Sequence, residues 1–149
     1  MRFYTVAQGA SDTLNTFLRQ NQLKATHFYI GRNVVNSWKE FLDAFQNDQD
    51  DFAVHTWTHP HMTGLSNADV VAQLGWTLQV IYDSTGGRIC RFWRPPYGDV
   101  DLRVDAIARE VFGLKAVVWN HEYVPYSRVI CTPPNLASAL RIGTLVTVQ

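Results

Sequence analysis

The chain has 149 residues, of which 46% are hydrophobic and 17% are charged. This length and composition suit one globular domain with an apolar core and exclude an intrinsically disordered chain. Thirteen basic and thirteen acidic residues cancel to a net charge of zero, so the charge balance gives no reason to expect nucleic acid or an anionic membrane as a partner.

Helix-like and strand-like segments alternate along most of the chain. Apolar residues at helical spacing predict helices at 12–21, 38–45, 66–82 and 99–112. Short apolar runs between turn residues predict strands at 24–30, 52–54, 89–93 and 115–119. Alternation of this kind predicts an α/β domain with mostly parallel strands and helices outside them.

Capping signals fix some of the helix ends. Ser66 followed by Asp69 resembles a capping box, Asp99 is a candidate cap for the helix that follows it, and Gly113 is its expected stop. Beyond residue 119 the pattern weakens, with a short helix predicted at 136–140 and a last strand at 145–148.

Export, membrane and cysteine signals are sparse. The first ten residues lack a basic start followed by an apolar run, so no signal peptide is expected. No apolar run approaches the roughly 20 residues of a transmembrane helix. Cys90 and Cys131 lack the short spacing of a zinc or redox pair, and the sequence leaves a disulfide between them open.

Polar or aromatic side chains follow three predicted strands directly. His55, Arg94 and Trp119 each fall at a strand end. Because active sites of α/β folds gather at the carboxyl ends of parallel strands, this shared placement marks a candidate site.

Residues 55–59, with the sequence HTWTH, set two imidazoles four positions apart. A proline follows at position 60, so a strand-to-loop turn is expected to hold the rings of His55 and His59. Neutral imidazoles suit zinc and similar divalent ions, and a catalytic site keeps one position open for water. The alternative is that these are ordinary polar loop histidines, with His61 as a further bystander.

Residues 91–98, with the sequence RFWRPPYG, form the second candidate segment. Pro95 and Pro96 pin the backbone just past a strand end, and Gly98 permits a tight turn or a close approach by ligand. Arg94 is then placed to hold a carboxylate through paired hydrogen bonds. The alternative is a proline-rich turn with Arg94 in solvent.

Together, the two segments resemble motifs of the polysaccharide deacetylases, the NodB-homology family, and most closely those of the fungal chitin deacetylases. The family pattern His-Ser/Thr-x-x-His is matched by residues 55–59, and the pattern Arg-Pro-Pro-Tyr-Gly by residues 94–98. Segments 24–31 and 118–120 are also similar to family positions. The resemblance covers residues 13–120, and the motifs are specific in their joint order and spacing.

The resemblance implies a distorted (β/α) barrel and a metal-dependent hydrolase that removes N-acetyl groups from a chitin-like polysaccharide. It implies that His55 and His59 bind the metal, with zinc or cobalt expected, and that Thr56 braces the histidine loop. It also implies that Arg94 orients an acidic general base and that the backbone N–H of Tyr97 donates to the oxyanion. The remaining expected substrate-binding residues are Pro95, Pro96 and Trp119.

The resemblance does not reach either end of the chain. The family's first strand ends in Asp-Asp-Gly, whereas Ala7 and Gln8 stand at the two acidic positions here. The family's late general-acid histidine has no counterpart in residues 145–149, and residues 121–149 diverge as a whole. The barrel is therefore expected to be incomplete at both ends of one domain spanning 1–149. A degenerate homologue and altered chain ends both fit, and the abrupt loss after Asn120 favours altered ends.

Three functions follow from the sequence. The first is an active deacetylase of chitin-like polymers, the second an inactive homologue that still binds polysaccharide, and the third a metal-binding or purely structural α/β domain. The family usually works on secreted or wall-associated polymers, while no export signal is found here, so the sequence leaves the compartment open.

Overall fold

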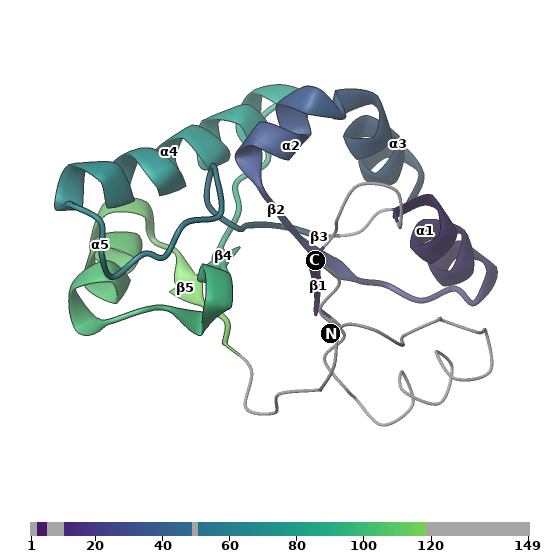
Figure 1. Cartoon of the computed structure of the whole chain (residues 1–149). Helices are drawn as coiled ribbons and strands as arrows, with labels where there is room; N and C mark the ends of the chain where they lie inside the picture. The colour runs from purple at the N-terminus through teal and green to yellow at the C-terminus, as the bar shows by residue number, and fades with distance from the viewer. Residues whose placement is uncertain (1–2, 6–10, 49–50, 119–149) are drawn as a thin grey trace.

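A computed structural model describes residues 3–5, 11–48 and 51–118 (Figure 1). The strands are β1 (Phe3–Thr5), β2 (Thr26–Tyr29), β3 (Asp51–Val54), β4 (Phe92–Trp93) and β5 (Lys115–Ala116). The helices are α1 (Ser11–Gln20), α2 (Gly31–Asn36), α3 (Trp38–Asp48), α4 (Asn67–Ser84) and α5 (Leu102–Phe112), with a 3₁₀ turn, η1 (Pro96–Gly98).

The five strands form one parallel sheet in the order β1-β2-β3-β4-β5. Each strand therefore pairs with the next strand along the chain. The helical connections between strands return the chain to the end of the sheet at which every strand begins. A doubly wound sheet reverses its strand order at a switch point, whereas a (β/α) barrel keeps the chain order. The described residues thus form an arc with barrel topology, which is the expected α/β architecture.

Both faces of the sheet carry buried side chains, and the helices cover one of these faces. Val54 and Trp93, paired across β3 and β4, are fully buried in a core with helix residues such as Leu74 of α4. Figure 1 shows the helices along the outside of the strands. Phe28 and Ala53 are also fully buried but do not belong to this helix-side core. Because side chains alternate along a strand, they lie on the opposite face of the sheet.

The expected caps of α4 and α5 differ in outcome. The Ser66 hydroxyl accepts the Asp69 N–H at 3.2 Å and donates to the Asp69 carboxylate at 2.6 Å, which confirms the capping box. Gly113 ends α5 in the left-handed conformation, as expected of a helix stop. The prediction that Asp99 caps α5 is wrong, because the Asp101 carboxylate accepts the Val104 N–H at 2.7 Å.

Other element bounds also differ from the predicted ones. Helix α2 was not expected, because Gly31 follows a strand as a stop signal would and the short helix lacks a full apolar stripe. The predicted strands at 89–93 and 115–119 shorten to two residues each. Ile89 lies before the observed strand and is 75% exposed, so this apolar residue did not indicate a buried strand position. The predicted elements at 136–140 and 145–148 lie outside the described residues.

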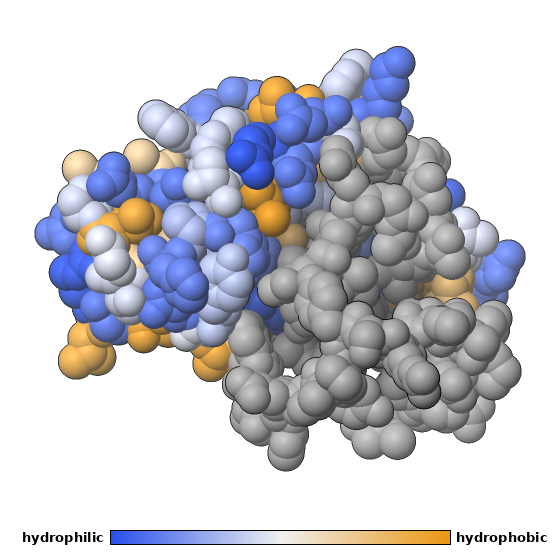
Figure 2. All heavy atoms as spheres, viewed as in Figure 1, coloured by the Kyte–Doolittle hydropathy of each residue, from blue (hydrophilic) through white to orange (hydrophobic). Residues whose placement is uncertain are grey.

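The described surface is mostly hydrophilic on the face shown in Figure 2, where hydrophobic residues occur as separate small groups. None of the described helices is both long and apolar enough to cross a lipid bilayer. Cys90 is buried with a free thiol, and burial raises the pKa of that thiol to about 12, which makes it unreactive at neutral pH. Its candidate disulfide partner, Cys131, lies outside the described residues.

Candidate functional site

His55 and Arg94 lie just past the carboxyl ends of neighbouring strands. The His55 N–H donates to Tyr29 O at 2.9 Å, and the Arg94 N–H donates to Val54 O at 2.9 Å. These two bonds extend the parallel sheet by one residue beyond β3 and beyond β4. The backbone therefore holds both residues at the edge where α/β folds place their active sites.

A direct contact joins the two sequence motifs. The Nδ1 atom of His55 lies 2.7 Å from the carbonyl oxygen of Arg94, and both residues are buried. A carbonyl oxygen only accepts hydrogen bonds, so His55 donates from Nδ1 and carries its lone pair on Nε2. Metal-binding histidines are commonly held in this way, with one ring nitrogen on a carbonyl and the other facing the ion.

Both imidazoles of the motif stay neutral at neutral pH. Burial lowers the pKa of His55 to about 3; His59 and Arg94 also lower it, against the opposing hydrogen bond to the Arg94 carbonyl. Burial also lowers the pKa of His59, and nearby His61 adds to that effect. Because a protonated imidazole cannot bind a metal, this environment favours the metal-binding form.

A tight turn brings the ring of His59 back to that of His55. The ring centroids are 4.8 Å apart at an interplanar angle of 73°. The Thr56 hydroxyl accepts the His59 N–H at 3.1 Å. Thr56 and His59 both have left-handed backbones, with φ of 65° and 63°. For residues with a Cβ this conformation costs about 1–2 kcal/mol each, and such strain clusters at functional sites.

Arg94 is fully buried, which excludes the alternative of an arginine in solvent. Its guanidinium lies over the ring of Phe28, 4.1 Å from the centroid, and its Nε donates to Val117 O at 3.4 Å. Burial lowers the pKa of Arg94 to about 10, so the side chain remains a cation at neutral pH. A fixed positive charge therefore lies within the fold beside the histidine turn.

The chain after Arg94 makes a short, strained turn. Tyr97 has φ of 58°, and the turn is closed by Gly98 N–H to Pro95 O at 3.2 Å and Asp99 N–H to Pro96 O at 2.9 Å. Pro95 and Pro96 are buried, while Tyr97 is 52% exposed. Three of the four described non-glycine residues with positive φ, Thr56, His59 and Tyr97, thus lie in the two motifs.

His61, expected only as a bystander, contacts the second motif and the residue that follows it. Its ring stacks on that of Tyr97 with centroids 4.2 Å apart, and Tyr97 also meets the His59 ring at 4.8 Å. Its Nδ1 lies 3.6 Å from the carboxylate of Asp99. The surface of the site therefore carries a row of rings, which the histidine spacing alone did not predict.

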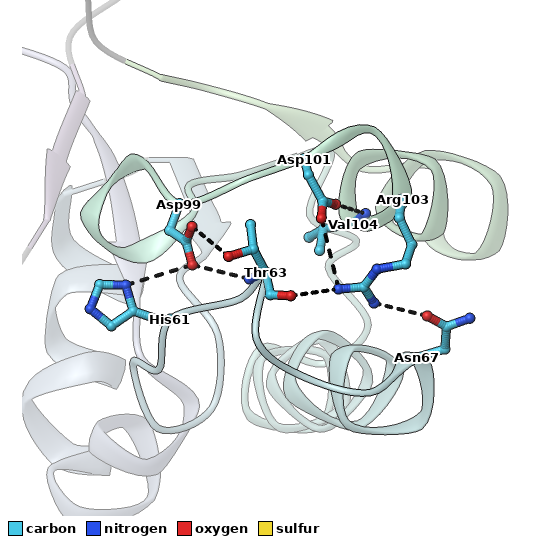
Figure 3. Close-up of polar contacts among 7 residues, drawn as sticks. All are labelled: His61, Thr63, Asn67, Asp99, Asp101, Arg103 and Val104. Carbon is cyan, nitrogen blue, oxygen red and sulfur yellow. Dashed lines mark hydrogen bonds and ion pairs between the residues drawn. The ribbon is translucent and has the colours of Figure 1, made fainter.

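Asp99 connects the histidine loop to the turn before α5 (Figure 3). The backbone N–H and hydroxyl of Thr63 donate to its carboxylate at 3.0 and 2.9 Å. The Thr63 N–H bond is the main cause that lowers the pKa of Asp99. On the other side of Thr63, Arg103 donates to the Thr63 carbonyl at 2.9 Å and to Asn67 at 2.8 Å. These contacts fix the far end of the loop.

His55 and His59 are the two candidate metal ligands among the described residues. Among residues 3–5, 11–48 and 51–118, no group of three or more His, Cys, Asp or Glu side chains could hold an ion. A catalytic zinc site usually has three protein ligands. The positions that follow β1, including Ala7 and Gln8, and the predicted substrate residue Trp119 lie outside the described residues. His55 and His59 therefore fit as part of a metal site, and no complete site is described.

A pocket of about 200 Å³ lies elsewhere on the described part of the chain. It is lined by residues around Cys90, among them Asp51, Arg88 and Arg91. Asp51 starts β3 and Arg91 precedes β4, so this pocket opens at the amino ends of the strands. In β/α folds that end supports stability rather than chemistry, and the paired motifs therefore define the candidate site.

The packing of α2 against the histidine loop gives a stability prediction. A Cβ at Gly31, the first residue of α2, would overlap the ring of Trp57 and lie 2.8 Å from Thr77 Oγ1. We expect Gly31→Ala to lower the free energy of unfolding by about 1–3 kcal/mol, as overpacking does. Gly64→Ala is the matched control, since nothing lies within 4 Å of its Cβ position. Urea unfolding measures the free energy of unfolding of both variants. Equal losses would contradict the close packing of Gly31 against Trp57.

Comparisons with known proteins identify similar sequences. A family model of the polysaccharide deacetylases matches residues 4–117. Chitin deacetylase 3 of Cryptococcus neoformans var. neoformans is 52% identical over 114 residues, which cover 75% of this chain and 28% of that protein. The chain thus spans less than a third of the length of this relative.

Solved structures show the same fold. A family 4 carbohydrate esterase from Streptomyces lividans, in complex with acetate, is 31% identical with a TM-score of 0.71, covering 80% of this chain and 60% of that one. A family 4 carbohydrate esterase pseudoenzyme from Bacillus anthracis is 27% identical with a TM-score of 0.72, covering 79% and 42%. These similarities confirm the expected fold of the polysaccharide deacetylase type.

Proposed function

Because this chain belongs to the polysaccharide deacetylase family, we propose that it is a metal-dependent hydrolase that removes N-acetyl groups from a chitin-like polysaccharide. The observation that carries the proposal is the buried 2.7 Å hydrogen bond from His55 Nδ1 to Arg94 O. It joins the two family motifs and leaves Nε2 of His55 available beside the ring of His59. The similarity to fungal chitin deacetylases supports the choice of polymer.

In this proposal His55 and His59 bind a divalent ion, zinc or cobalt. When bound, such an ion polarises the amide carbonyl and lowers the pKa of its water. Thr56 holds the histidine turn through its bond to the His59 N–H. The buried cation of Arg94 would orient a carboxylate that acts as general base; because Ala7 and Gln8 stand at the family's acidic positions, another residue must supply that carboxylate. The Tyr97 N–H would donate to the developing oxyanion. The proposed substrate-binding residues are Pro95, Pro96 and Trp119.

Acetate release from soluble chitin oligomers tests the proposal directly. The 149-residue chain is assayed with added zinc, with added cobalt, and with a chelator, after circular dichroism has shown that it is folded. We expect release that depends on the metal and stops with the chelator. A folded protein that releases no acetate with either ion would reject catalysis by this chain.

A second candidate function is an inactive homologue that binds polysaccharide. Ala7 and Gln8, at the family's acidic positions, favour it, as does the absence of a third ligand among the described residues. The similarity to a pseudoenzyme of the same esterase family supports it too. This function predicts retention on chitin without acetate release, and a gain of release when Ala7→Asp and Gln8→Asp are combined. Release by the unaltered chain would exclude it.

A further inference from the structure

The two middle residues of the histidine turn are held by one side chain of α4. The N–H groups of Trp57 and Thr58 both donate to Oε1 of Gln73, at 2.8 and 2.9 Å. In return, Nε2 of Gln73 donates to the Thr58 hydroxyl at 2.8 Å. One amide thus makes three hydrogen bonds to the segment between His55 and His59.

The opposite side of the same turn is held by α2. The N–H of Gly31 donates to Thr56 O at 3.0 Å, and the N–H of Arg32 donates to Trp57 O at 3.1 Å. Two N–H groups and two C=O groups of the turn are therefore bonded to residues of two helices. The α2 contacts come from backbone atoms, so among these contacts only Gln73 can be changed by a conservative substitution.

The bonds of Gln73 fall between two strained residues. Thr56 and His59, on either side of the pair it holds, both have left-handed backbones. A turn with two such residues persists only when its surroundings determine it. Accepting two successive N–H groups on one oxygen fixes the directions of the 56–57 and 57–58 peptide planes. Both planes lie on the backbone path that leads from His55 to His59.

We propose that Gln73 is a positioning residue that sets the ring of His59 against that of His55 so that both can face one ion. The inference rests on the proposed function in that it assigns these two rings to a metal. It concerns a residue that lacks metal-binding chemistry of its own and that the sequence motifs do not include.

Three variants separate this role from general stability. Gln73→Met keeps the length and removes all three hydrogen bonds. Gln73→Glu keeps an oxygen that can accept both N–H groups, and the Thr58 hydroxyl can donate to it. Gln79→Met is the matched control, because Gln79 is a glutamine of the same helix whose amide contacts exposed Asp83 at 2.8 Å.

The first measurement is made on the full chain without metal. Amide exchange of Trp57 and Thr58, and the ring resonances of His55 and His59, are followed by NMR. We expect Gln73→Met to accelerate exchange at both amides and to shift the His59 ring, with the other two variants close to the unaltered chain. Unchanged exchange and unchanged rings in Gln73→Met would overturn the proposal.

The second measurement is binding of Co²⁺, read by calorimetry and by its visible absorption. We expect Gln73→Met to weaken binding by about tenfold or more, in the range seen for outer-shell partners, and Gln73→Glu to restore it. Equal affinity and spectrum in Gln73→Met would overturn the proposal even if the amides exchange faster. If the unaltered chain binds no cobalt, the proposed metal function fails, and the NMR measurement alone decides on Gln73.

Discussion

Replacing His55 by glutamine should raise the dissociation constant for Zn²⁺ or Co²⁺ by more than about 100-fold, the upper range for loss of an outer-shell partner. The reason is that Nε2 of His55 is left as a lone-pair donor when Nδ1 bonds to the Arg94 carbonyl. His59→Gln should weaken binding similarly, because His59 is the second proposed ligand and its ring lies 4.8 Å from that of His55. Isothermal titration of the full chain measures both constants, and acetate release should fall in parallel.

His61→Gln is the matched control for this prediction. His61 lies in the same loop, but its contacts are the Tyr97 ring and the Asp99 carboxylate, and it completes no group of three ligands in the described part of the chain. The dissociation constant of the His61→Gln variant for the metal should stay within about threefold of that of the unaltered chain, as for a surface substitution. An equal loss in all three variants would mean that the loop, rather than the two named rings, determines binding.

Acidification should destabilise the metal-free protein through His55. The folded pKa of His55 is about 3, while the unfolded value is about 6.5, so between these limits the unfolded chain binds more protons. Stability from the neutral, buried ring is thus fully present above pH 6.5 and is lost as the pH falls. By pH 4 the free energy of unfolding should fall by roughly 3 kcal/mol from this residue alone.

Urea unfolding at a series of pH values between 7 and 4, with chelator present, measures this loss. His59, whose pKa is also lowered, acts in the same direction. Asp99 has a lowered pKa as well, but a carboxylate of that kind loses its contribution only as the pH falls below its ordinary value of 3.8. His55→Gln should flatten the profile over this window. A variant with the same slope as the unaltered chain would contradict the burial of a neutral His55.

The fold was predictable where side-chain pattern and backbone geometry agree. Ser66 at the start of α4 and Gly113 at the end of α5 have the roles that the sequence predicts. Asp99 does not, because its carboxylate is taken by Thr63, a partner 36 residues away that no local pattern contains. Helix α2 was missed for a related reason, since its packing against α4 and the Trp57 ring replaces an apolar stripe of its own.

The candidate site shows the same division. The strand-end positions of His55 and Arg94 follow from short apolar runs and from the rule that parallel strands share a carboxyl edge. The bond between His55 and the Arg94 carbonyl does not follow from either motif, because it joins a side chain to a backbone atom. The role of Gln73 could not be predicted either, since a glutamine inside a predicted helix looks like an ordinary polar position.

The protonation state of the His55 ring is the most direct check on the proposed metal site. Long-range ¹H–¹⁵N spectra of the full chain distinguish a ring protonated on Nδ1 from one protonated on Nε2. The 2.7 Å bond to the Arg94 carbonyl predicts Nδ1–H with a bare Nε2, retained from neutral pH down to about pH 4 because burial lowers the pKa to about 3. Addition of Zn²⁺ should then shift the Nε2 resonance. A ring protonated on Nε2, or one that titrates near pH 6.5 as a free histidine does, would contradict the account.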